Sequence, residues 1–156
     1  MGAGEWVLLA YRMPREPSTP RIAVWRKLRR LGAMQLVDGL VALPADPATI
    51  EAFDWLADEV LEAGGEAWTW QARPGSKSQG AELAERARRA VAEEYDALLR
   101  EIAAVGDDPE PRAVERLRRE LRRIQLRDRF GSPAGETARL ALQRLSVVPP
   151  ARVTPS

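Results

Sequence analysis

Residues 33–44, AMQLVDGLVALP, decide the fold. Two short apolar segments flank the pair Asp38-Gly39, and this dipeptide is typical of a tight type I′ hairpin turn, in which both central residues need a positive φ. The sequence therefore predicts two neighbouring antiparallel strands on either side of the turn.

The chain before this hairpin predicts one strand and one helix. Glu5 to Arg12 (EWVLLAYR) is an apolar run of strand length, too short for a buried helix. Residues 17–32 (PSTPRIAVWRKLRRLG) have the pattern of a helix, with Ser18 or Thr19 as its cap and Gly32 at its end.

The chain after the hairpin repeats this arrangement in the opposite order. Asp46 and Pro47 begin a second predicted helix, which ends at Gly64-Gly65. EAWTWQA, residues 66–72, alternates with period two and predicts a fourth strand. The order β-α-β-β-α-β predicts an α+β fold: a ferredoxin-like four-stranded antiparallel sheet over residues 5–74, with both helices on one face.

Beyond a polar linker at residues 75–80, the pattern becomes helical. Two predicted helices, roughly 81–105 and 111–129, form an arginine-rich antiparallel hairpin. A short C-terminal helix ends near Leu145, so the second predicted domain covers residues 81–145. The last residues, 146–156, are predicted to be a disordered tail.

Tryptophans are expected to contribute to the core. Trp25 falls on the apolar side of the first predicted helix with Ile22 and Leu28. Trp68 and Trp70 share one face of the last strand, and we expect them to pack between the sheet and the helical hairpin. Stacking of nucleic-acid bases is the alternative, but the strands lack the basic and glycine neighbours of single-stranded RNA readers.

Composition excludes several classes of chemistry. The chain has no cysteine and no histidine, which excludes disulfides, thiolate metal sites and imidazole bases. Without an acidic cluster or a glycine-rich phosphate loop, we expect no metal, no cofactor and no enzymatic activity. The N-terminus has no signal-peptide pattern and no run is long enough to span a bilayer, so we expect a cytoplasmic protein without membrane contact.

Basic residues concentrate in the second half of the chain. Five arginines on the predicted helix 111–129 are spaced four, three, four and four residues apart, which places them in one stripe: Arg112, Arg116, Arg119, Arg123 and Arg127. The stripe fits a nucleic-acid backbone, a small oxyanion, or a solvated face paired with glutamates of residues 82–101. Arg21, Arg26 and Arg30 on the first helix make a second basic strip.

Several of these segments resemble one protein family. Trp6, RIAVWRKLRRLGA (21–33), VDGLVALP (37–44), GGEAW (64–68) and RDRF (127–130) are similar to the N-terminal domain of the chromate resistance protein ChrB family, over roughly residues 5–145. Arg26 matches the Trp-Arg pair of that family.

The resemblance implies a chromate-responsive transcriptional regulator or sensor whose N-terminal domain binds DNA or a chromate-like oxyanion through arginines. As protein partners we expect a second copy of the chain or a separate protein that carries the family's C-terminal domain. The alternative is a protein–protein interaction module, dimeric or not, that binds neither nucleic acid nor anions.

Overall fold

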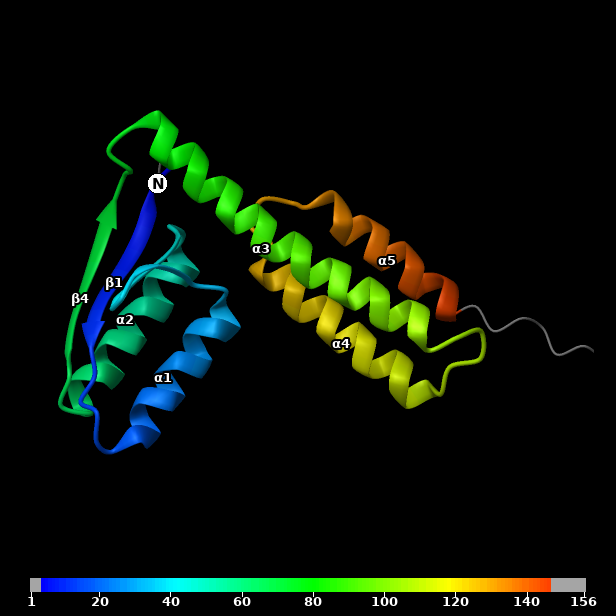
Figure 1. Ribbon diagram of the computed structural model, residues 1–156, viewed down its shortest axis with the longest axis horizontal. Helices are drawn as coiled ribbons and strands as arrows, with labels where there is room; N and C mark the ends of the chain where they lie inside the picture. The colour runs from blue at the N-terminus through cyan, green and yellow to red at the C-terminus, as the bar shows by residue number, and fades with distance from the viewer. Residues whose placement is uncertain (1–3, 147–156) are drawn as a thin grey trace, which may run out of the picture. The chain divides into compact units, whose positions relative to one another are not determined.

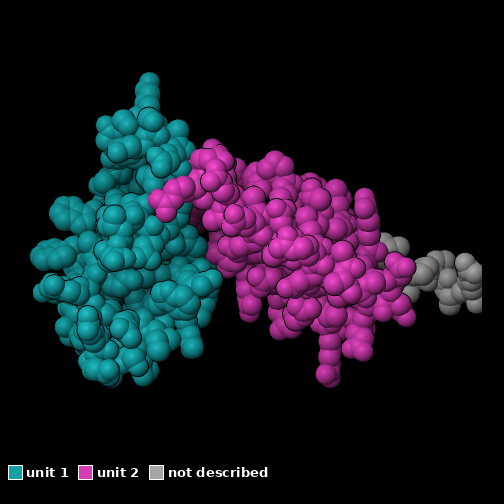
Figure 2. Space-filling view, in the orientation of Figure 1, with its two compact units in different colours: residues 1–84 teal, residues 85–156 magenta. Residues whose placement is uncertain are grey.

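The computed structural model describes residues 4–146, and the chain divides into two compact units, residues 1–84 and 85–156 (Figure 2). Apart from Ser146, the predicted tail lies outside the described residues. The α+β class expected from the sequence is confirmed, because a four-stranded antiparallel sheet is combined with five helices.

The first unit has the predicted β-α-β-β-α-β order. Its elements are β1 (Trp6–Arg12), α1 (Ser18–Leu31), β2 (Met34–Val37), β3 (Leu40–Pro44), α2 (Pro47–Glu62) and β4 (Glu66–Ala72). The sheet order is β2-β3-β1-β4, and every neighbouring pair is antiparallel. The two edges of the sheet are therefore β2 and β4.

Helices α1 and α2 cover one face of this sheet (Figure 1). Alternate residues of β1 and β3 point toward them, and the buried core consists of Val7, Leu9, Val24, Leu28, Val41, Leu43, Phe53, Leu56 and Val60. The start of α2 is fixed by a capping box: the Asp46 side chain accepts a hydrogen bond from Thr49 N at 2.8 Å, and Asp46 N donates to Thr49 Oγ1 at 2.9 Å.

The hairpin between β2 and β3 lies where the sequence predicts it, but its turn type differs. Gly39 has φ 75°, whereas no residue other than glycine has a positive φ among residues 4–146, so Asp38 lacks the backbone of a type I′ turn. An irregularity between Gln35 and Val37 changes the local register instead. Gly39 is still required, because a Cβ there would lie 2.7 Å from Tyr11 O.

The helices of the C-terminal half are α3 (Lys77–Ala104), α4 (Pro111–Arg127) and α5 (Pro133–Ser146). In the second unit they bury a common core of Tyr95, Leu98, Ile102, Leu117, Leu121, Ile124, Ala138 and Leu142. The predicted linker at 75–80 is partly wrong, since α3 begins at Lys77. Ser76 caps it there: Ser76 Oγ accepts a hydrogen bond from Gln79 N at 3.1 Å.

Candidate functional site

Three arginines of the predicted stripe line a groove between α3 and α4. The groove has a volume of about 480 Å³, and its charged lining consists of Arg116, Arg119, Arg123, Glu94, Glu101 and Glu120. Arg116 contacts Glu101 at 3.1 Å, and Arg123 contacts Glu120 at 3.5 Å. With as many carboxylates as guanidinium groups, the groove has no net positive charge to attract an anion.

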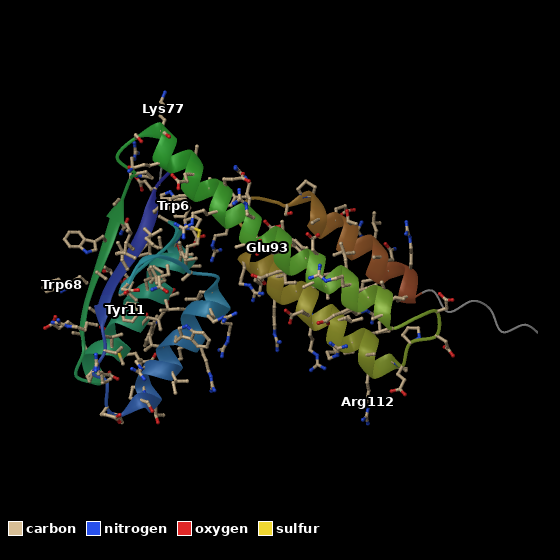
Figure 3. The ribbon with its side chains drawn as sticks, in the orientation of Figure 1. Trp6, Tyr11, Trp68, Lys77, Glu93 and Arg112 are labelled. Carbon is tan, nitrogen blue, oxygen red and sulfur yellow. The ribbon has the colours of Figure 1, made fainter. Side chains whose placement is uncertain are left out.

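The two ends of the stripe differ in environment. Arg127 is only 13% exposed and pairs with Glu94 of α3, so its guanidinium fastens α4 to α3. Arg112 extends from the start of α4 away from the neighbouring helices (Figure 3). Arg112 and Arg119 are exposed, and neither forms an ion pair with a described residue.

The other predicted strip, on α1, is basic without acidic neighbours in its own helix. The helix contains Arg21, Arg26, Lys27, Arg29 and Arg30 and no acidic residue. It orients them outward because Val24 and Leu28, four residues apart, are the side chains buried against the sheet.

Two of the five cations of α1 have neither an acidic residue nor a stacked aromatic ring beside them within residues 4–146. Lys27 contacts Glu59 of α2 at 2.7 Å, and Arg29 stacks over the Trp25 ring at 4.9 Å. Arg21 and Arg26 are exposed and form no ion pair within residues 4–146. Arg30 lines a groove of about 630 Å³ between α1 and α2 that also contains Asp58, Glu59 and Glu62. The cations without a nearby acid are therefore Arg21 and Arg26.

The seven predicted site residues therefore belong to two separate sets. Arg21 and Arg26 lie in the first unit, and the five arginines of α4 lie in the second. Within the second set, the structure brings Arg116, Arg119 and Arg123 to one groove.

The prediction that Trp25 belongs to the core is wrong, because this side chain is 52% exposed. Its helix buries the series Val24, Leu28 and Leu31 instead, and Trp25 lies beside that series. The stacking of Arg29 on Trp25 places an aromatic ring within the basic face. The i, i+4 spacing of these two residues is the sequence signal that could have identified the pair.

The prediction that Trp68 and Trp70 pack between the sheet and the helical hairpin is also wrong. They are 67% and 58% exposed, and Trp68 projects from β4 on the side away from α1 and α2 (Figure 3). Both lie on the sheet face that these helices leave uncovered, since Trp70 is opposite Leu8 and Trp68 is opposite Ala10 in the β1–β4 register.

The RDRF segment, residues 127–130, stabilises the second unit. Asp128 accepts hydrogen bonds from Gly131 N at 2.9 Å, from Ser132 N at 2.8 Å and from the Tyr95 hydroxyl at 3.1 Å. Burial of the phenol, reinforced by the negative charge of Asp128, raises the pKa of Tyr95 to about 12. Sequence reasoning missed this contact because Tyr95 and Asp128 are 33 positions apart.

Residues 4–146 contain neither a metal-binding group of side chains nor a membrane-spanning helix. No three acidic side chains there come together in a group that could hold a metal ion. No helix in the same range is long and apolar enough to cross a membrane.

Comparisons with known proteins identify relatives of a segment that covers most of the first unit and the start of the second. The family model described as "Protein ChrB, N-terminal" matches residues 21–108. The chain is 32% identical over 77 residues to "Protein ChrB" of Cupriavidus metallidurans, which is 49% of this chain and 24% of that protein. The chain thus spans about a quarter of the length of this relative. No solved structure matches the chain. The matched segment contains α1 from Arg21 onward and ends before α4.

Proposed function

The chain belongs to the family of ChrB N-terminal domains, and from this premise we propose that it is a non-enzymatic regulatory domain of a chromate response, which binds DNA through the basic face of α1. One observation carries the proposal: α1 has five basic residues and no acidic residue, and Arg21 and Arg26 lack ion-pair partners within the described residues. All five basic residues of this helix also lie inside the segment that matches the family.

The chemistry of α1 suits a phosphate backbone. Guanidinium groups donate paired hydrogen bonds to phosphate oxygens, and such contacts position a protein on DNA without reading its sequence. Arg21 and Arg26 are five residues apart, which is about 7.5 Å along the helix axis and, at 3.6 residues per turn, about 140° around it. The two side chains can therefore contact separate phosphates.

The arginine stripe of α4 is a weaker candidate than α1 for binding either DNA or a chromate-like oxyanion. Its three central arginines face an equal number of glutamates in the groove between α3 and α4, so a phosphate or chromate-like anion would have to displace existing ion pairs. Desolvating the glutamates of that groove beside an anion would oppose binding further.

The test compares two double variants that remove the same charge. Arg21→Ala with Arg26→Ala removes two unpaired arginines from α1, and Arg112→Ala with Arg119→Ala removes two unpaired arginines from α4. Binding of each protein to a labelled duplex is followed by fluorescence anisotropy over a salt series. Each lost phosphate contact should reduce the slope of log K against log salt by about 0.9, so the α1 variant should lose roughly 2 and the α4 variant little.

The opposite pattern would overturn the proposal. Equal losses in the two variants would mean that the chain binds DNA through its total charge, and a loss confined to the α4 variant would move the interface to the second unit. Far-UV circular dichroism of both variants checks that the helices are retained.

A further inference from the structure

The edge strand β4 combines features that sheet edges usually avoid. Within residues 4–146 it pairs with β1 alone, and its other side is open (Figure 1). Five of its seven residues run Trp-Thr-Trp-Gln-Ala, residues 68–72, and all five are exposed. The strand contains no proline and no lysine, and its one charged residue, Glu66, is held by Arg12 at 2.8 Å. Charges, prolines and bulges are what normally protect an edge strand from pairing with another chain.

The ladder determines which backbone groups of β4 are free. Tyr11 N donates to Gly39 O at 2.8 Å, and Ala45 N donates to Glu5 O at 2.9 Å, so the odd-numbered residues of β1 direct their polar groups toward β3. The even-numbered residues must then direct theirs toward β4, where they are opposite residues 66, 68, 70 and 72. The N–H and C=O groups of Ala67, Thr69 and Gln71 consequently point out from the open edge.

We propose that β4 is a dimerisation strand, which pairs antiparallel with β4 of a second copy of this chain about a two-fold axis at Thr69. Thr69 is the central residue of the seven in β4, so this register overlaps the whole strand. In this register the outward N–H and C=O groups of Thr69 bond those of the other copy's Thr69. Ala67 of each copy bonds Gln71 of the other in the same way, which gives about six backbone hydrogen bonds in total.

The side chains favour a second copy as the occupant, because this register is complementary to itself. A two-fold axis normal to the sheet places the tryptophan-bearing faces of both copies on the same side of the joined sheet. Trp68 of each copy then lies opposite Trp70 of the other. Cross-strand aromatic pairs of this kind stabilise antiparallel sheets. Glu66 lies opposite Ala72, so no two like charges meet.

Within the sheet, the exposed tryptophans lie at this edge. On the same sheet face, Trp6 and Ala42 are buried, whereas Trp68 and Trp70 are exposed. The proposed interface consists of four exposed indole rings and two strand edges, a small contact beside the roughly 1,200–2,000 Å² that stable complexes bury. We therefore expect a dimer that dissociates on dilution.

Cysteine cross-linking tests the register directly, because the chain has no cysteine of its own. In Thr69→Cys, the two Cα atoms would be about 5.5 Å apart in a hydrogen-bonded pair, which is within the range of a disulfide. The matched control is Gln71→Cys, an exposed residue on the same edge. In the dimer, position 71 of one chain lies opposite position 67 of the other, so the two residues at position 71 would be about 13 Å apart along the strands. Mild oxidation of the full chain should cross-link the first variant at least tenfold faster than the second.

Charge substitution at Thr69 provides a second, non-covalent test. Residue 69 is opposite itself in the proposed pair, so Thr69→Lys and Thr69→Glu should each be monomeric where the unaltered chain is dimeric. An equimolar mixture of the two should recover the dimer. Light scattering between about 5 and about 500 μM covers the range expected for an interface of this size, and circular dichroism checks that each variant is folded.

Three results would overturn the proposal. The first is a chain that stays monomeric at every concentration, which would mean that another segment or no partner covers β4. The second is a dimer in which Thr69→Cys does not cross-link, or in which Gln71→Cys does so equally fast. The third is a mixture of the Thr69→Lys and Thr69→Glu chains that remains monomeric.

Discussion

Helices α1 and α4 are both rich in arginine, yet their arginines have different surroundings. In α4, acidic residues of the same helix and of α3 contact most of the stripe, as the pairs Arg116–Glu101, Arg123–Glu120 and Arg127–Glu94 show. In α1 the single ion pair within the described residues is Lys27–Glu59. The number of arginines on a helix therefore does not identify a binding surface.

The cause of the difference lies in what each helix packs against. Helix α4 has two partners, α3 and α5, in a bundle whose surface alternates acid and base, so a long side chain finds a carboxylate within reach. Helix α1 packs its Val24 and Leu28 side against an apolar sheet face and turns its opposite side outward. Three arginines of the α4 stripe are engaged in ion pairs of the bundle, whereas Arg21 and Arg26 of α1 have no ion pair to a described residue and remain available for a partner.

The buried face of α4 stabilises the second unit far more than the exposed face of α1 stabilises the first. Leu117 is fully buried, so Leu117→Ala should lower the free energy of unfolding of the second unit by about 2–5 kcal/mol. Trp25→Ala on α1 removes a larger but half-exposed side chain and should cost less than about 1 kcal/mol. Urea unfolding followed by circular dichroism at the helix band measures both values.

Tryptophan emission and circular dichroism can follow the unfolding of the two units separately. All five tryptophans lie in residues 1–84, so tryptophan emission reports on the first unit alone. In Leu117→Ala the emission transition should keep its midpoint while the circular dichroism transition moves to lower urea. Coincident shifts of both signals would show that the units unfold together, and the comparison of α1 with α4 would then lack independent readouts.

A smaller effect distinguishes a structural arginine from a free one. Arg127 is mostly buried and its partner Glu94 is half-buried, so Arg127→Ala leaves a poorly solvated carboxylate and should destabilise the second unit by about 1–2 kcal/mol. Arg26→Ala should change stability by less than about 0.5 kcal/mol, because its guanidinium lies in solvent without an ion pair to a described residue.

Thermal unfolding and DNA binding, both measured on Arg127→Ala and on Arg26→Ala, test whether the first arginine is structural and the second binds DNA. Arg127→Ala should lose stability and retain its DNA affinity, whereas Arg26→Ala should retain stability and lose affinity. If both variants lose affinity and neither loses stability, Arg127 is not the structural residue described above.

Local patterns predicted the elements of the first unit. The Asp38-Gly39 pair placed the β2–β3 hairpin, and the Asp46-Pro47 pair placed the start of α2, because both signals depend on residues a few positions apart. The turn type was not predictable from the dipeptide alone. The irregularity at residues 35–37 adjusts the register, so that Asp38 needs no positive φ.

The errors arose where a side chain's burial depends on which surface covers it. Hydrophobicity suggested burial of Trp25, Trp68 and Trp70, but the apolar pattern does not specify whether a second layer covers a given sheet face. The pairing of α4 with glutamates of α3 was one of the alternatives open from sequence, and Glu94 and Glu101 are indeed among its partners. Which arginines remain unpaired could only be seen in three dimensions.

A hydrogen bond from α3 helps to fix the C-terminal end of α4. Tyr95 of α3 donates a hydrogen bond to Asp128 at 3.1 Å, whereas α1 terminates at Gly32, whose φ of 75° lets its backbone N–H bond back to the last turn. Tyr95→Phe keeps the buried ring and removes only the hydrogen bond to Asp128. It should cost about 1 kcal/mol at neutral pH, because Asp128 retains its bonds from Gly131 N and Ser132 N.

The pH dependence gives this last prediction its control. The pKa of Tyr95 is raised to about 12 in the folded protein, above its ordinary value of about 10, so the fold favours the protonated phenol. The associated stability is fully present below about pH 10 and is lost as the pH rises toward 12. Tyr95→Phe should remove this loss. Tyr11, whose pKa is also raised by burial, titrates in both proteins, so the difference between their unfolding free energies from pH 7 to about pH 11.5 isolates Tyr95. If this difference stays constant over the pH range, the protonated phenol of Tyr95 does not stabilise the end of α4.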